Sequence, residues 1–317
     1  MGAIWVYAEV AGGKVDQAAL EILTKARDLG DELAAVTLGP GATAAAEVLG
    51  EHGAATVYAS DDDVYVDYVA QPAVQALDEL MSEHAPELVL FATNYDSRDI
   101  AGRLAARTGA TLMSNAVGLV STDVARSAIF GGTHFVDVQL GGAPRIVLVR
   151  PKSFEAQATG GKAKVVLVEV AISDDARGAR RVERHEEAAS GPRLEEAPVV
   201  ISGGRGLQDP ANFELLDELA AELGAAVGAT RAVVDAGWVP YAYQIGQTGT
   251  TIKPNVYLAF GISGATQHVV GMKGAKKIVA VNKDEDAPIL QIADLGVVGD
   301  ALEILPQLIE EVKARKG

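Results

Sequence analysis

The amino-acid sequence predicts an α/β fold built from two doubly wound, mostly parallel sheets. Short apolar segments alternate with amphipathic segments of helical length along most of the 317 residues. Only 5% of the residues are aromatic, whereas alanine, valine, leucine and glycine are abundant, a balance typical of parallel sheets covered by alanine-rich helices. A charged segment near the middle separates two such stretches, so we expect one domain over residues 1–190 and another over 191–317.

The first half of the chain repeats the order strand, helix, strand. Residues 4–10 form an apolar run that predicts a strand, residues 15–29 are amphipathic, and residues 32–38 are apolar again. The same alternation then predicts helices at 42–51, 66–83 and 101–108 and strands at 56–59 and 88–92. Strands that alternate with helices of this length are typical of a doubly wound parallel sheet.

Residues 116–170 show a different, β-rich pattern. Strand candidates at 134–140, 145–149 and 165–170 are separated by glycine pairs at 131–132, 141–142 and 160–161. Because glycine pairs are common in the tight turns of hairpins, this segment predicts an antiparallel extension of the first sheet.

Residues 174–196 predict an exposed linker. This segment contains five arginines and seven acidic residues with little apolar periodicity, and it ends in turn-forming residues. Beyond it the alternation begins again, with strands expected at 199–202, 225–229, 257–260 and 278–282 and helices at 212–223 and 301–315.

The charge and the cysteine content narrow the chemistry. The 27 basic and 43 acidic residues give a net charge of −16, which disfavours nucleic acid as a partner. The chain has no cysteine, which excludes disulfides, thiolate zinc sites and cysteine-bound iron–sulfur clusters within it. Its 5 histidines lack metal-ligand spacing, so we expect any redox chemistry to come from an organic cofactor or a partner protein. With no basic leader and no apolar run of roughly 18–20 residues, we expect a cytoplasmic protein that is not membrane-embedded.

Glycine-rich and polar loops of the second half lie where its predicted strands end. These loops occupy residues 202–206, 246–249, 261–268 and 282–284. In an open parallel sheet the carboxyl ends of all strands lie at one edge, where ligands bind. Glycine allows a ligand to approach the backbone closely, and Ser263, before a predicted helix start, offers a hydroxyl and backbone N–H groups to a phosphate. Arg205 and Arg231 would add positive charge, so we expect one site for an anionic ligand.

The first half holds a competing signal in the turn from Gly39 to Ala44. This turn follows a predicted strand, opens a helix and matches the pattern G-x-G-x-x-A, with Asp61 and Asp63 about 20 residues further on. The pattern predicts, as an alternative, an NAD(P)-dependent α/β enzyme. Against it, the turn follows the second strand instead of the first, and Pro40 lacks an N–H group that such a loop would use.

Several segments of the second half together resemble the FAD-binding domain of the electron transfer flavoprotein alpha subunit. They are SGGRG at 202–206, AVGATR at 226–231, VDAG at 234–237, QIGQTG at 244–249, GISGATQH at 261–268, IVAVNKD at 278–284 and DAPI at 286–289. The resemblance extends in order over residues 199–310, and the first half fits the less characteristic first domain of the family. It implies a Rossmann-like FAD-binding domain in the second half.

The resemblance also implies roles for individual residues in holding FAD. Arg231 would lie against the isoalloxazine ring, Thr248 would share a hydrogen bond with flavin N5, and His268 would lie near the N1 and C2-carbonyl end. The other residues implied in binding are Arg205, Thr230, Ile245, Gly246, Gln247, Ser263, Gly264, Ala265, Thr266, Gln267, Asn282, Asp300 and Ala301, with Asp300 toward the adenosine. Thr230 stands where many members have serine, and Ala301 replaces a larger apolar residue. No catalytic residue or metal ligand is implied.

By the same resemblance, the chain would be one subunit of a heterodimer whose other subunit is called beta. The heterodimer would carry electrons from primary dehydrogenases, such as the acyl-CoA dehydrogenases of fatty acid beta-oxidation, to a membrane quinone oxidoreductase. Residues 1–190 would contact the beta subunit. A flavin surrounded by a cation and hydrogen-bond donors is sufficient for such a carrier, which explains why the sequence shows no nucleophile or metal site.

Overall fold

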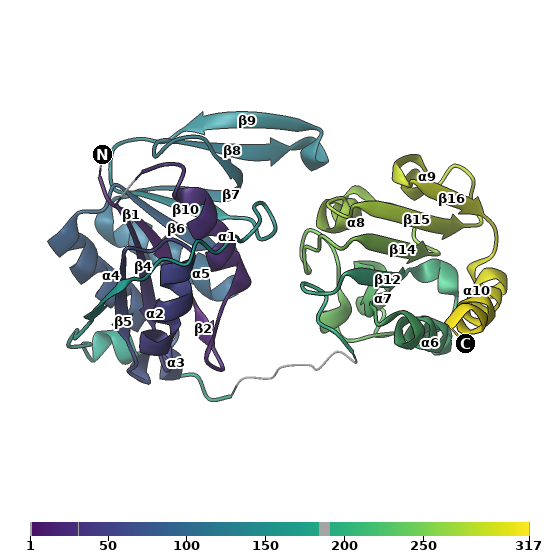
Figure 1. Ribbon diagram of the computed structural model, residues 1–317, viewed down its shortest axis with the longest axis horizontal. Coiled ribbons are helices and arrows are strands. Elements are labelled where there is room, and N and C mark those ends of the chain that lie inside the picture. Colours follow the sequence, from purple (N-terminus) through teal and green to yellow (C-terminus); the bar gives the residue numbers. More distant parts are fainter. Residues whose placement is uncertain (1, 31, 184–190, 317) are drawn as a thin grey trace. The chain divides into compact units, whose positions relative to one another are not determined.

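The computed structural model describes residues 2–30, 32–183 and 191–316, and Figure 1 shows their helices and strands. The chain divides into two compact units, residues 1–184 and 185–317. The boundary expected between residues 190 and 191 lies at the end of the segment 184–190, which is outside the described residues. Both units are α/β with mainly parallel sheets, which confirms the expected fold class.

The first unit is built on a nine-stranded sheet in the order β11-β5-β4-β1-β6-β10-β7-β8-β9. The strands from β11 to β7 are parallel, whereas β7, β8 and β9 pair antiparallel. In chain order the strands are β1 (Ile4–Tyr7), β4 (Leu33–Leu38), β5 (Thr56–Ser60), β6 (Leu88–Ala92), β7 (Thr111–Leu119), β8 (Val124–Ile129), β9 (His134–Gln139), β10 (Arg145–Val149) and β11 (Lys164–Leu167). A separate ladder joins β2 (Val10–Ala11) to β3 (Lys14–Val15).

Helices cover both faces of this sheet because its central strands are apolar on both sides. Side chains of β1 alternate between two cores: Ile4 and Val6 pack with α1 (Gln17–Ala26) and α2 (Ala42–Glu51), and Trp5 and Tyr7 pack with α4 (Gln71–His84) and α5 (Tyr95–Thr108). The short helix α3 (Val64–Asp67) precedes α4. The first unit is therefore doubly wound, as the alternation of strands and helices predicted.

The expected antiparallel extension over residues 116–170 is confirmed only for β8 and β9. The strand β10 instead lies inside the parallel sheet between β6 and β7, and β11 pairs in parallel with β5 at the far edge. The run from Ile146 to Val149 is buried at every position, with exposed fractions of 2% or less, which is the pattern of a central parallel strand covered on both faces. The glycine pair at 131–132 thus lies in the expected hairpin turn between β8 and β9, whereas the pairs at 141–142 and 160–161 belong to the connections that lead to β10 and β11.

The exposed linker expected at 174–196 is shorter in the structure. Residues Asp175–Arg177 form a 3-10 turn whose Ala176 is buried against Val64, and the Arg181 guanidinium donates to the Val66 carbonyl oxygen. At the other end Leu194 and Ala197 are buried in the second unit. Apolar residues at both ends of the charged segment therefore anchor it to the cores.

The second unit is a five-stranded parallel sheet in the order β13-β12-β14-β15-β16. Its strands are β12 (Val199–Gly203), β13 (Ala226–Ala229), β14 (Val256–Phe260), β15 (Lys277–Asn282) and β16 (Leu295–Val298). One face packs against α6 (Phe213–Leu223), α7 (Arg231–Val234) and α10 (Ala301–Lys316), and the other against α8 (Thr266–Met272) and α9 (Pro288–Ile292). The sequence analysis did not include β16, whose apolar run LGVV has only four residues and is interrupted by a glycine; three of the four residues are exposed.

Candidate cofactor-binding site

The order of the second sheet contains one point where the chain changes direction. Across the sheet, the strands that come second, first, third, fourth and fifth in the chain lie in that order. The chain therefore runs from β12 to its neighbour β13 on one side, crosses to β14 on the other side of β12, and continues in that direction to β15 and β16. Ligands of doubly wound sheets bind at the carboxyl ends of the strands at such a point. The expected loops follow these strand ends, and Figure 1 shows β12 and β14 side by side.

Three glycines allow the loops after β12 and β14 to interlock. The N–H of Gly206 donates to the Gly261 carbonyl oxygen over 3.0 Å. A Cβ atom on Gly204 would lie 2.5 Å from that same oxygen, and one on Gly206 would lie 2.5 Å from the Gly261 Cα. Gly261 itself has a φ of +62°, a backbone conformation that residues other than glycine rarely adopt. Only glycine therefore fits this junction, and Arg205 stands exposed beside it.

Thr230 and Arg231 follow β13 at the same edge. The Thr230 N–H donates to the Gly203 carbonyl oxygen over 3.1 Å, which ties this turn to the end of β12. The Arg231 guanidinium lies 3.0 Å from an Asp235 carboxylate oxygen, and the two side chains are 65% and 60% exposed. An ion pair this exposed contributes little to stability, so Arg231 can turn toward a ligand at little cost.

The loop that carries Thr248 is held to both neighbours. The Ile245 N–H donates to the Ala229 carbonyl oxygen over 3.0 Å, and the Gln247 N–H donates to the Gln267 carbonyl oxygen over 2.7 Å. The side-chain amide of the buried Gln244 donates to the Thr248 hydroxyl over 3.1 Å, and the Tyr241 hydroxyl donates to the Thr248 carbonyl oxygen. The Thr248 hydroxyl oxygen is thus held in place while its own proton remains free to donate.

His268 lies inside the unit, not on its surface. Its side chain is 6% exposed, and its two ring nitrogens contact the Ile245 carbonyl oxygen at 3.0 Å and the Tyr257 hydroxyl at 2.7 Å. Burial lowers the pKa of His268 to about 4, so the imidazole is neutral at physiological pH.

The loop after β14 turns sharply at Gly264, whose φ is +87°, and the Ile289 N–H donates to the Ser263 carbonyl oxygen over 3.1 Å. This turn leaves four implied binding residues exposed at the start of α8: Ser263, Ala265, Thr266 and Gln267. The hydroxyl groups of Ser263 and Thr266 and the amide of Gln267 are therefore exposed at the beginning of α8, next to the carboxyl end of β14.

Asn282 and Asp300 close the opposite side of the site. The Asn282 amide donates to the Ile262 carbonyl oxygen over 2.8 Å, which links the loops after β15 and β14. Lys283 lies 2.7 Å from an Asp300 carboxylate oxygen, and its hydrogen bond holds the pKa of that carboxyl below its usual value. Asp300 also accepts a hydrogen bond from the Leu302 N–H at the start of α10.

The implied binding residues all lie at this edge of the second sheet, but their side chains differ in access. Ile245 and Ala301 are buried in the apolar cores, so they could contact a ligand only through their backbones. The exposed side chains are those of Arg205, Arg231, Gln247, Thr248, Ser263, Ala265, Thr266 and Gln267, whereas Thr230, Asn282 and Asp300 are half-buried and Gly246, Gly264 and His268 are buried.

Sequence reasoning missed three residues that support the site. Gln244 holds the Thr248 hydroxyl, Tyr257 holds His268, and Lys283 pairs with Asp300. Gln244 and Lys283 lie in the segments 244–249 and 278–284 that carry the family resemblance, but no local pattern shows what their side chains contact. The role of Tyr257 depends on a contact between separate segments.

The competing turn of the first unit is closed by a carboxylate of the chain. The Thr43 N–H, at the start of α2, donates to an Asp61 carboxylate oxygen over 3.1 Å, and hydrogen bonds from Thr43 hold the pKa of Asp61 below its usual value. A phosphate bound by a helix N-terminus would need these same N–H groups. Asp61, which the pattern offered as a ribose ligand, thus occupies the phosphate position instead.

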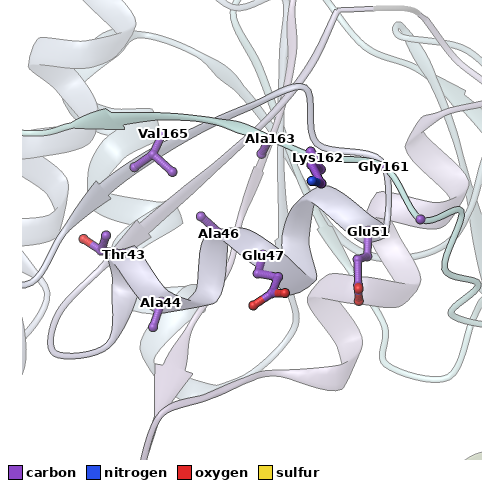
Figure 2. A pocket seen from close by; sticks show the side chains of 10 residues that line it. Thr43, Ala44, Ala46, Glu47, Glu51, Gly161, Lys162, Ala163 and Val165 are labelled. Carbon is purple, nitrogen blue, oxygen red and sulfur yellow. The ribbon is translucent and has the colours of Figure 1, made fainter.

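A groove of about 490 Å³ lies beside the same helix (Figure 2). It is lined by Thr43, Ala44, Ala46, Glu47 and Glu51 of α2 and by residues 160–163 and Val165. Two carboxylates and the single ammonium group of Lys162 give this groove no net positive charge. It therefore offers little attraction to a dinucleotide phosphate.

The described residues contain neither a candidate metal site nor a helix that could span a membrane. No group of three or more histidine or acidic side chains there could hold a metal ion. None of the helices in the described ranges is both long and apolar enough to cross a membrane.

Comparison with known proteins assigns the family. Residues 193–273 match the family model described as the electron transfer flavoprotein FAD-binding domain, and residues 4–175 match the electron transfer flavoprotein domain. The FAD-binding match includes the interlocked loops and the Thr248 loop, so FAD is the cofactor of the second unit; Asn282, Asp300 and Ala301 lie beyond the matched residues.

Full-length relatives agree with the domain matches. The chain is 45% identical to the electron transfer flavoprotein subunit alpha of Mycobacterium tuberculosis (strain H37Rv), with 100% of both chains covered. It is 43% identical to that of Mycobacterium leprae over 98% of each chain, and 38% identical to that of Syntrophomonas wolfei over 99% of this chain and 100% of the relative. The chain therefore belongs to the electron transfer flavoprotein family, among its alpha subunits.

Proposed function

We propose that this chain is the FAD-holding subunit of a cytoplasmic, two-subunit electron carrier. The carrier accepts electrons from primary dehydrogenases, including the acyl-CoA dehydrogenases of fatty acid beta-oxidation, and delivers them to a membrane quinone oxidoreductase. The observation that carries the proposal is the glycine junction of Gly204, Gly206 and Gly261, which lies at the strand-order reversal within the FAD-binding match. The chain turns over no substrate of its own.

The residues at this edge fit FAD. The glycine junction holds the loops after β12 and β14 together at the strand-order reversal, and the exposed start of α8 offers hydroxyl and N–H donors to a pyrophosphate. FAD supplies the redox chemistry when bound, because its ring system accepts and releases electrons. The protein's task is to bind the ring, to orient it and to set its potential.

Arg231 supplies the positive charge in this proposal. Its guanidinium is largely exposed and only weakly held by Asp235. Placed against the ring system, it favours the reduced, negatively charged flavin over the oxidised, neutral one and so raises the midpoint potential.

Thr248 supplies a directed hydrogen-bond donor at flavin N5. Because Gln244 already donates to its oxygen, the hydroxyl proton points to another acceptor. The flavin nitrogen is such an acceptor, and the backbone hydrogen bonds of Ile245 and Gln247 keep the loop in position.

His268 acts near flavin N1 and C2 through the backbone that it holds. Both of its ring nitrogens are engaged within the chain, so the imidazole supports the Ile245–Thr248 segment instead of contacting the flavin directly. Arg205 and Arg231 remain the exposed cations among the implied binding residues.

The hairpin of β8 and β9 supports the proposed contact with a beta subunit. Every residue of β9 is exposed, and Phe130 and Phe135 are 77% and 59% exposed. Val136 and Val138 add apolar surface on β9. These apolar side chains are exposed on both faces of the hairpin, and exposed apolar surface marks interaction sites. The hairpin lies in the first unit, which we assign to the beta-subunit contact.

The proposed function is tested by supplying the carrier with a donor. The chain, co-expressed with its beta subunit, is mixed with an acyl-CoA dehydrogenase, an acyl-CoA and a dye that accepts electrons only from the carrier. We expect dye reduction that needs all components and scales with the carrier concentration. Direct oxidation of NADH or NADPH by the chain without a dehydrogenase would instead favour an NAD(P)-dependent enzyme.

A further inference from the structure

A buried chain of hydrogen bonds links the core of the second unit to the Thr248 loop. Tyr257 on β14 is fully buried, and its hydroxyl lies 2.7 Å from Nε2 of His268 at the start of α8. The other ring nitrogen, Nδ1, lies 3.0 Å from the Ile245 carbonyl oxygen. Three separate segments are thus joined through one imidazole ring.

The partners determine where the protons lie. A carbonyl oxygen can only accept, so Nδ1 carries the proton and donates it to Ile245. A neutral ring then has its lone pair on Nε2, and the Tyr257 hydroxyl must donate to it. Burial, which disfavours the charged ring, supports this neutral form.

The accepting carbonyl belongs to the segment that positions Thr248. Ile245 begins that loop, and Gly246 next to it packs closely against α8: a Cβ atom on Gly246 would lie 2.8 Å from the Gln267 carbonyl oxygen, and one on Gly271 would lie 2.4 Å from the Gly246 nitrogen. A shift of the His268 ring would therefore move the Ile245 carbonyl. The Thr248 hydroxyl, which lies three residues further along the chain, would move with it.

We propose that Tyr257 is a positioning residue for FAD binding: Tyr257 fixes His268 in the Nδ1-protonated tautomer, and His268 in turn holds the Ile245–Thr248 segment in its binding conformation. The inference rests on the proposed function, because it assigns this segment to the flavin. Tyr257 itself touches no ligand: it is fully buried in the apolar core behind the site.

The first test reads the tautomer directly. The chain is labelled with ¹⁵N-histidine and studied in complex with its beta subunit by ¹H–¹⁵N correlation of the ring nitrogens, and His268→Gln assigns the signal by its loss. We expect the Nδ1-protonated pattern in the wild type and a changed Nε2 signal in Tyr257→Phe, which keeps the ring but removes the donor. An Nε2-protonated wild type, or an unchanged spectrum in the variant, overturns the proposal.

The second test measures FAD affinity. We expect Tyr257→Phe to raise the FAD dissociation constant of the complex about tenfold, the effect of losing one buried hydrogen bond. The matched control is Tyr7→Phe, which removes the hydroxyl of a buried tyrosine in the first unit and should leave the constant unchanged. A lower melting temperature in Tyr257→Phe with unchanged FAD affinity would show a purely structural role and overturn the proposal. A wild-type complex that binds no FAD would instead contradict the proposed function.

Discussion

The side-chain amide of Gln244 donates to the hydroxyl of Thr248 over 3.1 Å, and this contact orients a group that we assign to flavin N5. Gln244 is 3% exposed and Thr248 is exposed, so a buried residue directs a surface hydroxyl. Because the Thr248 oxygen accepts the hydrogen bond from Gln244, the hydroxyl proton remains available to a ligand.

Replacing Thr248 should weaken the hold on the flavin that has taken up one electron, whose N5 still accepts a hydrogen bond, without unfolding the chain. In Thr248→Met the hydroxyl is lost and bulk is added at an exposed position, so we expect a lower midpoint potential for the first electron and an unchanged melting temperature. Gln244→Leu should act in the same direction by releasing the hydroxyl, and Thr248→Ser, which keeps it, serves as the control. A redox titration in which Thr248→Met matches the wild type would remove Thr248 from the site.

Arg231→Ala should lower the midpoint potential by removing the positive charge next to the reduced ring. The expected shift is on the order of 60 mV, which corresponds to a tenfold change in a one-electron equilibrium. Arg231→Lys keeps the charge and should retain part of the effect. A dye-mediated titration with equal potentials in wild type and Arg231→Ala would contradict the assignment of Arg231.

Gly206→Ala should abolish FAD binding, because its Cβ atom would lie 2.5 Å from the Gly261 Cα. The backbone cannot yield cheaply there, so the junction must open and the second unit should also lose stability. The matched control is Gly102→Ala on α5, where a Cβ atom has no neighbour within 4 Å and alanine should stabilise the helix by roughly 0.5–1 kcal/mol. Full flavin content in Gly206→Ala would place FAD elsewhere.

Asp61→Asn should destabilise the first unit by roughly 0.5 kcal/mol through the loss of a carboxylate at the start of α2. The folded-state pKa of Asp61 is lowered, so its contribution is complete above the ordinary value of 3.8 and is lost as the pH falls through the folded-state pKa. Urea unfolding at pH 7 and at acidic pH measures both effects. A variant as stable as the wild type at pH 7 would contradict the capping role, and flavin content should not change in either case.

The sequence predicted the alternation of strands and helices in both units and the edge that carries the site, because those depend on local patterns and on where strands end. It placed β10 wrongly, since Arg145–Val149 is too short to distinguish a central parallel strand from a hairpin strand without knowing its neighbours. For the same reason it read the turn from Gly39 to Ala44 as a possible phosphate loop. The contact between Thr43 and Asp61, which closes that loop, joins residues 18 positions apart and leaves no local pattern.

Within the site, the sequence identified exposed donors more readily than supporting residues. Thr248 and Arg231 lie in recognisable loops, whereas Gln244 and Tyr257 act through contacts that only folding creates. His268 was expected beside the flavin, and its burial between Tyr257 and Ile245 could not be read from a single histidine in a glycine-rich segment.

The most direct test of the account is the flavin content of the chain purified with its beta subunit, measured by absorption spectroscopy before and after adding FAD. We expect visible flavin bands, with one FAD for each copy of this chain, and bleaching of those bands on stepwise reduction. A colourless complex that takes up no added FAD would contradict the account and would instead favour an NAD(P)-dependent enzyme that uses the turn from Gly39 to Ala44 in the first unit.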